Sequence, residues 1–149
     1  VYEGGIRVPA IFYFPPLTNG SRTVDNYFCN LDYTATIGEL LQTNFATPDG
    51  QSFLPLLKNN ASFNRGALYW HYPHFSNQMG RPAAAIRDGD YKLVYLFETE
   101  QTELFNLKAD PGERTPVNGQ NKAIEKRLKA ELFAWLKSVN ASFAVKKHR

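Results

Sequence analysis

The sequence predicts an α+β fold in which an antiparallel sheet of about four strands is covered by one helix. Two patterns predict it: an Asp-Gly pair between two runs of strand-forming residues and, further along the chain, an apolar stripe with the helical period. An Asp-Gly pair tolerates the positive φ angles of a tight hairpin turn, which favours antiparallel neighbours. A sheet that buries one face under a helix is a two-layer α+β arrangement.

The predicted sheet is centred on the hairpin whose turn contains Asp88-Gly89. Its strands are expected over residues 83–87 and 91–96, where strand-forming side chains dominate. A polar turn follows, and residues 102–107 are expected to form a third strand of the meander. Residues 67–71 are short, aromatic and apolar. They are the expected fourth strand.

The predicted covering helix begins at Lys122. From Ile124 to Val139 the apolar residues recur at spacings of four, four, three, one and three, which places them on one face of a helix. Packing of this face on the sheet is favoured over binding of a partner protein. Leu132 and Trp135 are therefore expected to be buried.

The N-terminal part of the chain is organised differently. A continuous apolar run, residues 10–14, lies between proline-containing segments and is typical of a strand buried on both faces of a parallel sheet. The other candidate of that kind, at residues 27–31, is weak, so the rest of a parallel sheet is not evident in this chain. Asp32 is expected to cap a short helix that extends to Gln42, with Ile37 and Leu41 on its apolar face.

Composition excludes several classes of protein. With 149 residues, of which 43% are hydrophobic, the chain can bury the core of about one domain. The net charge of +3 is spread along the chain, apart from a basic run at residues 146–149. That run is interpreted as a solvated end, because no aromatic or Gly-rich pattern of nucleic-acid binding accompanies it. No apolar run approaches the roughly 20 residues of a membrane span. The single cysteine, Cys29, is expected to be a small buried residue and leaves the redox compartment open.

The candidate binding residues are His71, His74 and Arg81. The two imidazoles stand among aromatic residues and are followed by Ser, Asn and Gln side chains, which together supply the donors and ring faces that hold a sugar or an anion. Packing of an aromatic loop around a hydrogen-bonded histidine is an equally open interpretation. No third His or Cys ligand is nearby, so a zinc site is not expected. No complete catalytic set is evident.

Five short motifs, taken in order, resemble the C-terminal portion of the sulfatase family. Each is modest alone, but their shared order is specific, and they cover nearly all of the chain up to Glu113. They are residues 2–9 (EGG-x-R-x-P), Leu31-Asp32 with its helix, residues 48–57 (DG-x-S-x-x-P-L-L), residues 86–93 (R-x-G-x-[WY]-K) and residues 103–113 (ELY-x-L-x-x-D-P-x-E).

The resemblance implies a division of the chain into two parts. Residues 1–62 would be the end of a large α/β domain of the alkaline-phosphatase type, incomplete here, and residues 63–149 the smaller C-terminal sheet-and-helix subdomain. The formylglycine nucleophile of sulfatases, their calcium ion and a sulfate-binding lysine would all belong to a portion that precedes this chain. No catalytic residue, metal ligand or cofactor is therefore expected in it. A periplasmic, secreted or lysosomal location is suggested by the resemblance alone.

The function that the resemblance implies is hydrolysis of a sulfate ester by the larger enzyme. This portion would contribute a wall of the substrate pocket, with His71 and His74 against the sugar or aromatic part of the ester and Arg81 against an anionic group. Its expected partners are the N-terminal catalytic portion of the same protein and a sulfated small molecule or glycan, with no nucleic acid and no membrane span. Two alternatives are open: a structural module that only closes off the catalytic domain, and an inactive carbohydrate- or anion-binding domain.

Overall fold

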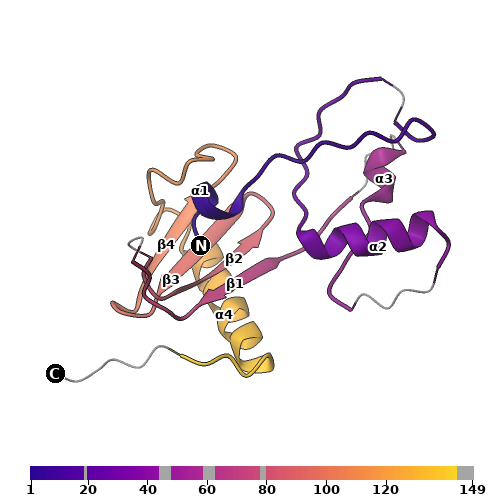
Figure 1. Cartoon of the computed structure of the whole chain (residues 1–149). Helices are drawn as coiled ribbons and strands as arrows, with labels where there is room; N and C mark the ends of the chain where they lie inside the picture. Colours follow the sequence, from indigo (N-terminus) through magenta and orange to yellow (C-terminus); the bar gives the residue numbers. More distant parts are fainter. Residues whose placement is uncertain (19, 44–47, 59–62, 78–79, 144–149) are drawn as a thin grey trace. The chain divides into compact units, whose positions relative to one another are not determined.

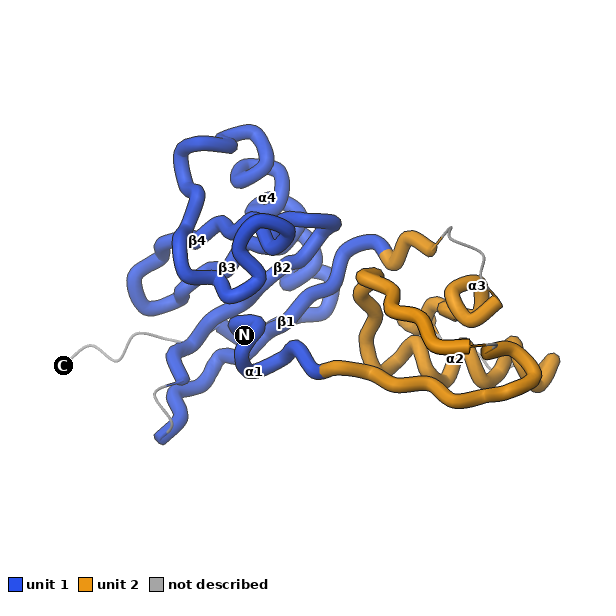
Figure 2. The backbone as a smooth tube through the Cα atoms, turned by 90° about the horizontal axis from the view of Figure 1, so that it is seen from above, with its two compact units in different colours: residues 1–8, 66–149 blue, residues 9–65 orange. Residues whose placement is uncertain are grey.

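The chain folds into two compact units, which Figures 1 and 2 show as a cartoon and as a tube. One unit contains residues 1–8 and 66–149, and the other contains residues 9–65. The division expected after residue 62 concerns a larger protein and stays a prediction. The computed structural model describes residues 1–18, 20–43, 48–58, 63–77 and 80–143, so the basic run at residues 146–149 lies outside the described residues.

The first unit is built on a four-stranded sheet in the order β1-β2-β3-β4, with every neighbouring pair antiparallel (Figure 1). Gly89, at the hairpin between β2 and β3, has a φ of 58°, which glycine adopts without steric cost. The predicted meander and its fourth strand are confirmed. The strands are β1 (Leu68–Tyr72), β2 (Ala83–Asp88), β3 (Tyr91–Leu96) and β4 (Gln101–Asn106).

Helix α4 (Lys122–Ser138) packs on one face of this sheet, as its apolar period predicts. Leu128, Leu132 and Leu136 each have no exposed surface. Beneath them, the sheet contributes Ala84, Ile86, Leu93, Tyr95 and Leu104 to one continuous core.

The structure corrects the expectation that Trp135 is buried. Trp135 is half-buried, and its ring stacks on Tyr69 with centroids 4.8 Å apart and planes 11° from parallel. Tyr69 belongs to β1, which lies at the edge of the sheet. Trp135 therefore closes the margin of the core rather than filling its centre.

The opposite face of the sheet carries a second core, which contains Ala83, Ala85, Val94, Leu96, Phe105 and Leu107. The N-terminal segment packs here: Val1 contacts this core, and the ring of Tyr2 meets Phe105 edge-on at 6.3 Å. The one-turn helix α1 (Glu3–Ile6) follows directly. A core thus packs against each face of the sheet.

The second unit contains α2 (Asn30–Leu40) and α3 (Leu54–Leu57). The cap of α2 is Cys29, and Asp32 is the third helical residue rather than the cap that the sequence predicts. Its predicted apolar face is also wrong, because Ile37 is 51% exposed. The residues of α2 that are buried are Asp32, Thr36 and Gly38.

A cluster of aromatic rings holds the second unit together. Phe12, Phe28, Tyr33 and Phe53 form ring contacts with centroids 4.5 to 5.9 Å apart. The buried strand predicted over residues 10–14 is not formed, since the described residues of this unit contain no strand with which it could pair. Phe12 packs inward while the neighbouring Ile11 is 94% exposed. Across the described part of the chain, no helix is long and apolar enough to cross a membrane.

Candidate functional site

His71 lies in β1, opposite Ala84 of β2, on the face that α4 covers. Its imidazole meets the ring of Phe97 edge-on at 5.7 Å. The Nε2 atom is buried and has no hydrogen-bond partner among the described residues. This burial lowers the pKa of His71, against a hydrogen bond with the backbone of Ser142 that raises it, so the neutral imidazole is favoured.

His74 follows the end of β1 and is exposed. Its ring stands edge-on to that of Tyr72 at 5.6 Å. Tyr72 is paired with Ala83, which belongs to the opposite face of the sheet from Ala84. The two histidines thus differ in environment, because His71 packs against the core and His74 is open to solvent.

Arg81 is bound to a carboxylate. Its Nε and Nη2 atoms lie 3.0 and 2.6 Å from Oε2 of Glu98, in the turn between β3 and β4. Both side chains are about half exposed, at 51% and 46%, where an ion pair contributes little to stability. An anion that binds Arg81 would compete with Glu98.

A buried ionic cluster, formed by Glu3, Arg87, Lys92 and Glu113, lies on the same side of the sheet as the second core. Lys92 Nζ is 3.0 Å from Oε1 of Glu3 and 2.8 Å from Oε1 of Glu113. Arg87 Nη1 is 3.5 Å from Oε2 of Glu3, whose backbone N–H donates to Glu113 Oε2. The side chains of Lys92, Glu3 and Glu113 are 0%, 5% and 2% exposed. Lys92 and the two carboxylates are thus out of water, whereas the Arg87 side chain is 17% exposed.

Sequence reasoning missed this cluster, although all four residues belong to the quoted motifs. The signal that could have revealed it is the alternation of β3. Lys92, Val94 and Leu96 lie on one face of the strand, so a lysine occupies an inward-facing position. A buried lysine requires a buried carboxylate.

A second charged group, in the other unit, is centred on Asp32, which is fully buried. Its carboxylate accepts hydrogen bonds from the backbone N–H groups of Cys29 and Gln51, at 2.9 and 2.8 Å, and from Arg65 Nε at 2.7 Å. Arg65 also donates to Cys29 Sγ at 3.6 Å. These contacts join the start of α2 to the segments that follow α2 and α3, which is a structural role.

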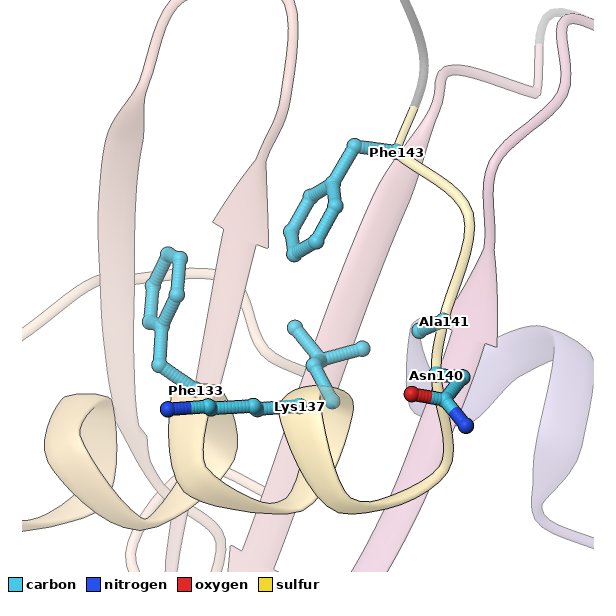
Figure 3. A pocket seen from close by; sticks show the side chains of 6 residues that line it. Phe133, Lys137, Asn140, Ala141 and Phe143 are labelled. Carbon is cyan, nitrogen blue, oxygen red and sulfur yellow. The ribbon is translucent and has the colours of Figure 1, made fainter.

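An open hollow of about 600 Å³ lies at the end of α4. Figure 3 shows Phe133 and Lys137 projecting from the helix, and Asn140, Ala141 and Phe143 in the segment that follows it. Its lining supplies one amine and one amide among apolar groups. That set has no catalytic chemistry of its own.

Within the described ranges, no three His, Cys, Asp or Glu residues come together as a metal-binding group would require. The described residues therefore do not fit the calcium ion that the resemblance implies. Cys29, a helix cap without a formylglycine motif around it, does not fit the nucleophile.

Comparison with known proteins identifies the family. The profile of the N-sulphoglucosamine sulphohydrolase C-terminal family matches residues 1–139. A sulfatase of Formosa agariphila is 31% identical over 158 aligned residues, which cover 94% of this chain and 29% of that protein. Human arylsulfatase H is 34% identical, over 83% of this chain and 27% of its own length. The chain thus spans less than a third of these relatives.

Solved structures share the fold. A putative sulfatase from Bacteroides thetaiotaomicron superposes with a TM-score of 0.61 at 20% identity, over 74% of this chain and 25% of that one. A protein solved in complex with its substrate D-glucosamine-2-N,6-O-disulfate superposes with a TM-score of 0.59 at 24% identity, over 78% of this chain and 25% of that one. The four-stranded sheet with its covering helix is thus an arrangement found in sulfatases, and the chain belongs to the sulfatase family as a C-terminal portion.

Proposed function

We propose that this chain is the C-terminal portion of an enzyme that hydrolyses sulfate esters, and that the nucleophile and the metal ligands belong to a preceding N-terminal portion. The observation that carries the proposal is the family match over residues 1–139 together with the length of the relatives, of which this chain covers 29% and 27%. Calcium and formylglycine are proposed for that preceding portion.

The exposed apolar residues of the second unit support a preceding portion that packs on it. Ile11 and Tyr13 are 94% and 86% exposed, although they belong to a continuous apolar run. An exposed apolar segment of this kind gains free energy when another part of the protein covers it. We assign residues 1–62 to the end of a large α/β domain on the resemblance, although residues 1–8 pack on the sheet of the other unit.

The proposed substrate class is a sulfated carbohydrate. Two findings support it: the matched family is named for a sulphoglucosamine sulphohydrolase, and one similar structure holds a disulfated glucosamine. The test is sulfate release by the full-length protein from D-glucosamine-2-N,6-O-disulfate and from a small aryl sulfate. We expect a higher kcat/KM on the sugar. A preference for the aryl sulfate would contradict the substrate class, and release from neither would contradict the function.

Within this chain, His74 is the best candidate for contact with the substrate. Its imidazole is exposed at the end of β1, and a neutral imidazole both donates and accepts hydrogen bonds, which suits sugar hydroxyls. His71 is proposed for the same wall, although its contact with Phe97 favours a packing role. Arg81 could hold an anionic group, and one that binds Nε and Nη2 would displace Glu98.

A substitution tests the role of His74. In the full-length protein, His74→Ala should lower kcat/KM on the sulfated sugar by about 10- to 1,000-fold, because hydrogen bonds that strengthen in the transition state would be lost. The loss should be smaller on an aryl sulfate too short to reach this wall. Equal losses on both substrates, together with a lower melting temperature, would instead assign His74 to packing.

The second candidate function is a structural module that closes off the catalytic domain. The burial of Lys92 and Glu113 and the packing of His71 favour it, because these polar side chains contact other residues of the same unit. In that case His74→Ala and Arg81→Ala would leave kcat and KM unchanged on every substrate.

A further inference from the structure

The buried ionic cluster fastens the N-terminal segment to the sheet. Glu3 is 89 residues from Lys92 in the sequence, and 110 from Glu113, yet it is bound to both. Burial of charged groups is costly, so such a cluster persists only when every member is paired with good geometry. Here one lysine lies between two carboxylates while Arg87 contacts one of them. The position of Glu3 is thereby fixed relative to β2 and β3.

Glu3 is the anchor of α1. It is the one residue of this four-residue helix that is buried. Buried ion pairs are weak contributors to stability compared with apolar side chains of similar volume, and their best-attested use is to specify one arrangement. We therefore interpret the cluster as a device that sets where α1 lies.

The two glycines of α1 show why that position matters. A Cβ added at Gly4 or at Gly5 would meet no atom of the described residues outside α1 and its chain neighbours within 4 Å, and neither glycine has the positive φ that favours glycine. Alanine would suit a helical turn better than either glycine. Both glycines therefore leave open space beside the backbone of α1, where another segment can approach closely.

We propose that Lys92 is a positioning residue for the sulfate-ester site of the full-length protein. With Glu113 and Arg87 it holds Glu3, and through Glu3 it holds α1, against whose diglycine face the N-terminal catalytic portion packs. This inference rests on the proposed function, because it supposes that the catalytic groups lie in that portion. Lys92 acts through the position of α1 and does not touch the substrate.

The experiment compares Lys92→Met with Lys126→Met in the full-length protein. Methionine keeps an apolar side chain of similar length and removes the charge, and Lys126 is an exposed residue of α4. Amide hydrogen exchange of residues 2–7, kcat and KM are measured for both variants. In Lys92→Met we expect exchange of residues 2–7 to rise at least about tenfold, while the amides of β3 stay protected.

The kinetic result separates positioning from binding. We expect kcat of Lys92→Met to fall about 10- to 100-fold, since small displacements of a catalytic arrangement have effects of that order. KM should change less than about threefold, because no substrate contact is lost. Lys126→Met should match the wild type in all three measurements.

Two further variants keep the proposal testable if Lys92→Met does not fold. Glu113→Gln preserves the shape of the side chain and removes one charge. It should also raise the exchange of residues 2–7 and lower kcat, but by less than Lys92→Met. Gly4→Ala should leave the melting temperature of the 149-residue chain unchanged or raised, yet lower kcat of the full-length protein.

Two outcomes would overturn the inference. One is a kcat within about twofold of wild type in a variant whose residues 2–7 exchange freely; the other is Glu113→Gln and Gly4→Ala variants that both keep wild-type kcat. If the wild-type full-length protein hydrolyses no sulfate ester, the proposed function fails, and the exchange data alone then report on the fastening of α1.

Discussion

At the scale of single residues, Asp32 illustrates what the sequence can and cannot predict. A capping acidic residue near this position was predictable, because Asp favours the first turn of a helix. Two of its three partners were not, since Gln51 and Arg65 reach it from 19 and 33 residues away. The cap itself is Cys29, which sequence preferences do not favour. Long-range partners thus decide the role of a charged residue.

We expect Asp32→Ala to lower the unfolding free energy of the second unit by about 3 kcal/mol, because Arg65 and two backbone N–H groups would lose their acceptor. Urea unfolding monitored by amide exchange in α2 measures this. Glu39→Ala, an exposed change on the same helix, should stay within about 0.5 kcal/mol of wild type. Equal effects of the two substitutions would show that the buried carboxylate contributes nothing specific.

His71 leads to a prediction for pH dependence. Burial lowers its pKa in the folded protein, whereas the unfolded chain has the ordinary value of about 6.5. As pH falls below that value, the unfolded state takes up the proton first, so the unfolding free energy declines. His71→Gln should make this decline between about pH 7 and pH 5 shallower. Equal slopes in His71→Gln and wild type, from urea unfolding at each pH, would rule the effect out.

At the scale of elements, the sheet and α4 follow the predictions, because their apolar residues repeat with periods of two and 3.6 and pack against each other within one unit. Residues 10–14 and the predicted apolar face of α2 share one feature. Ile11 and Ile37 are exposed, so among the described residues their side chains join no core. The predicted apolar face of α2 is therefore wrong, and the strand at residues 10–14, whose neighbours are expected outside this chain, stays a prediction. Periodicity identifies an apolar face but not the partner that buries it.

The packing of α4 can be tested by comparing two substitutions. Leu132 is fully buried, so Leu132→Ala should cost about 3 kcal/mol of unfolding free energy. Trp135 is half-buried over Tyr69, so Trp135→Ala should cost less, about 1–2 kcal/mol. Denaturant unfolding monitored by circular dichroism compares them, with exposed Lys126→Ala as the control. A larger loss for Trp135→Ala would mean that the centre of the core lies elsewhere.

At the scale of the whole molecule, the order of the motifs predicts the family, and the matched profile and relatives confirm it. What the order does not predict is that the first, fourth and fifth motifs meet through Glu3, Lys92 and Glu113. A motif records which residues occur together in sequence, whereas ion pairing depends on strands that the fold brings together. The roles of His71, His74 and Arg81 stay predictions, since they depend on a substrate and on a larger protein.

We propose that this chain completes a sulfatase whose nucleophile belongs to a preceding portion of the same protein. The most direct measurement is sulfate release from an aryl sulfate by the purified 149-residue chain and by the full-length protein, each with and without a calcium chelator. We expect release by the full-length protein alone. Release by the 149-residue chain that the chelator abolishes would contradict it.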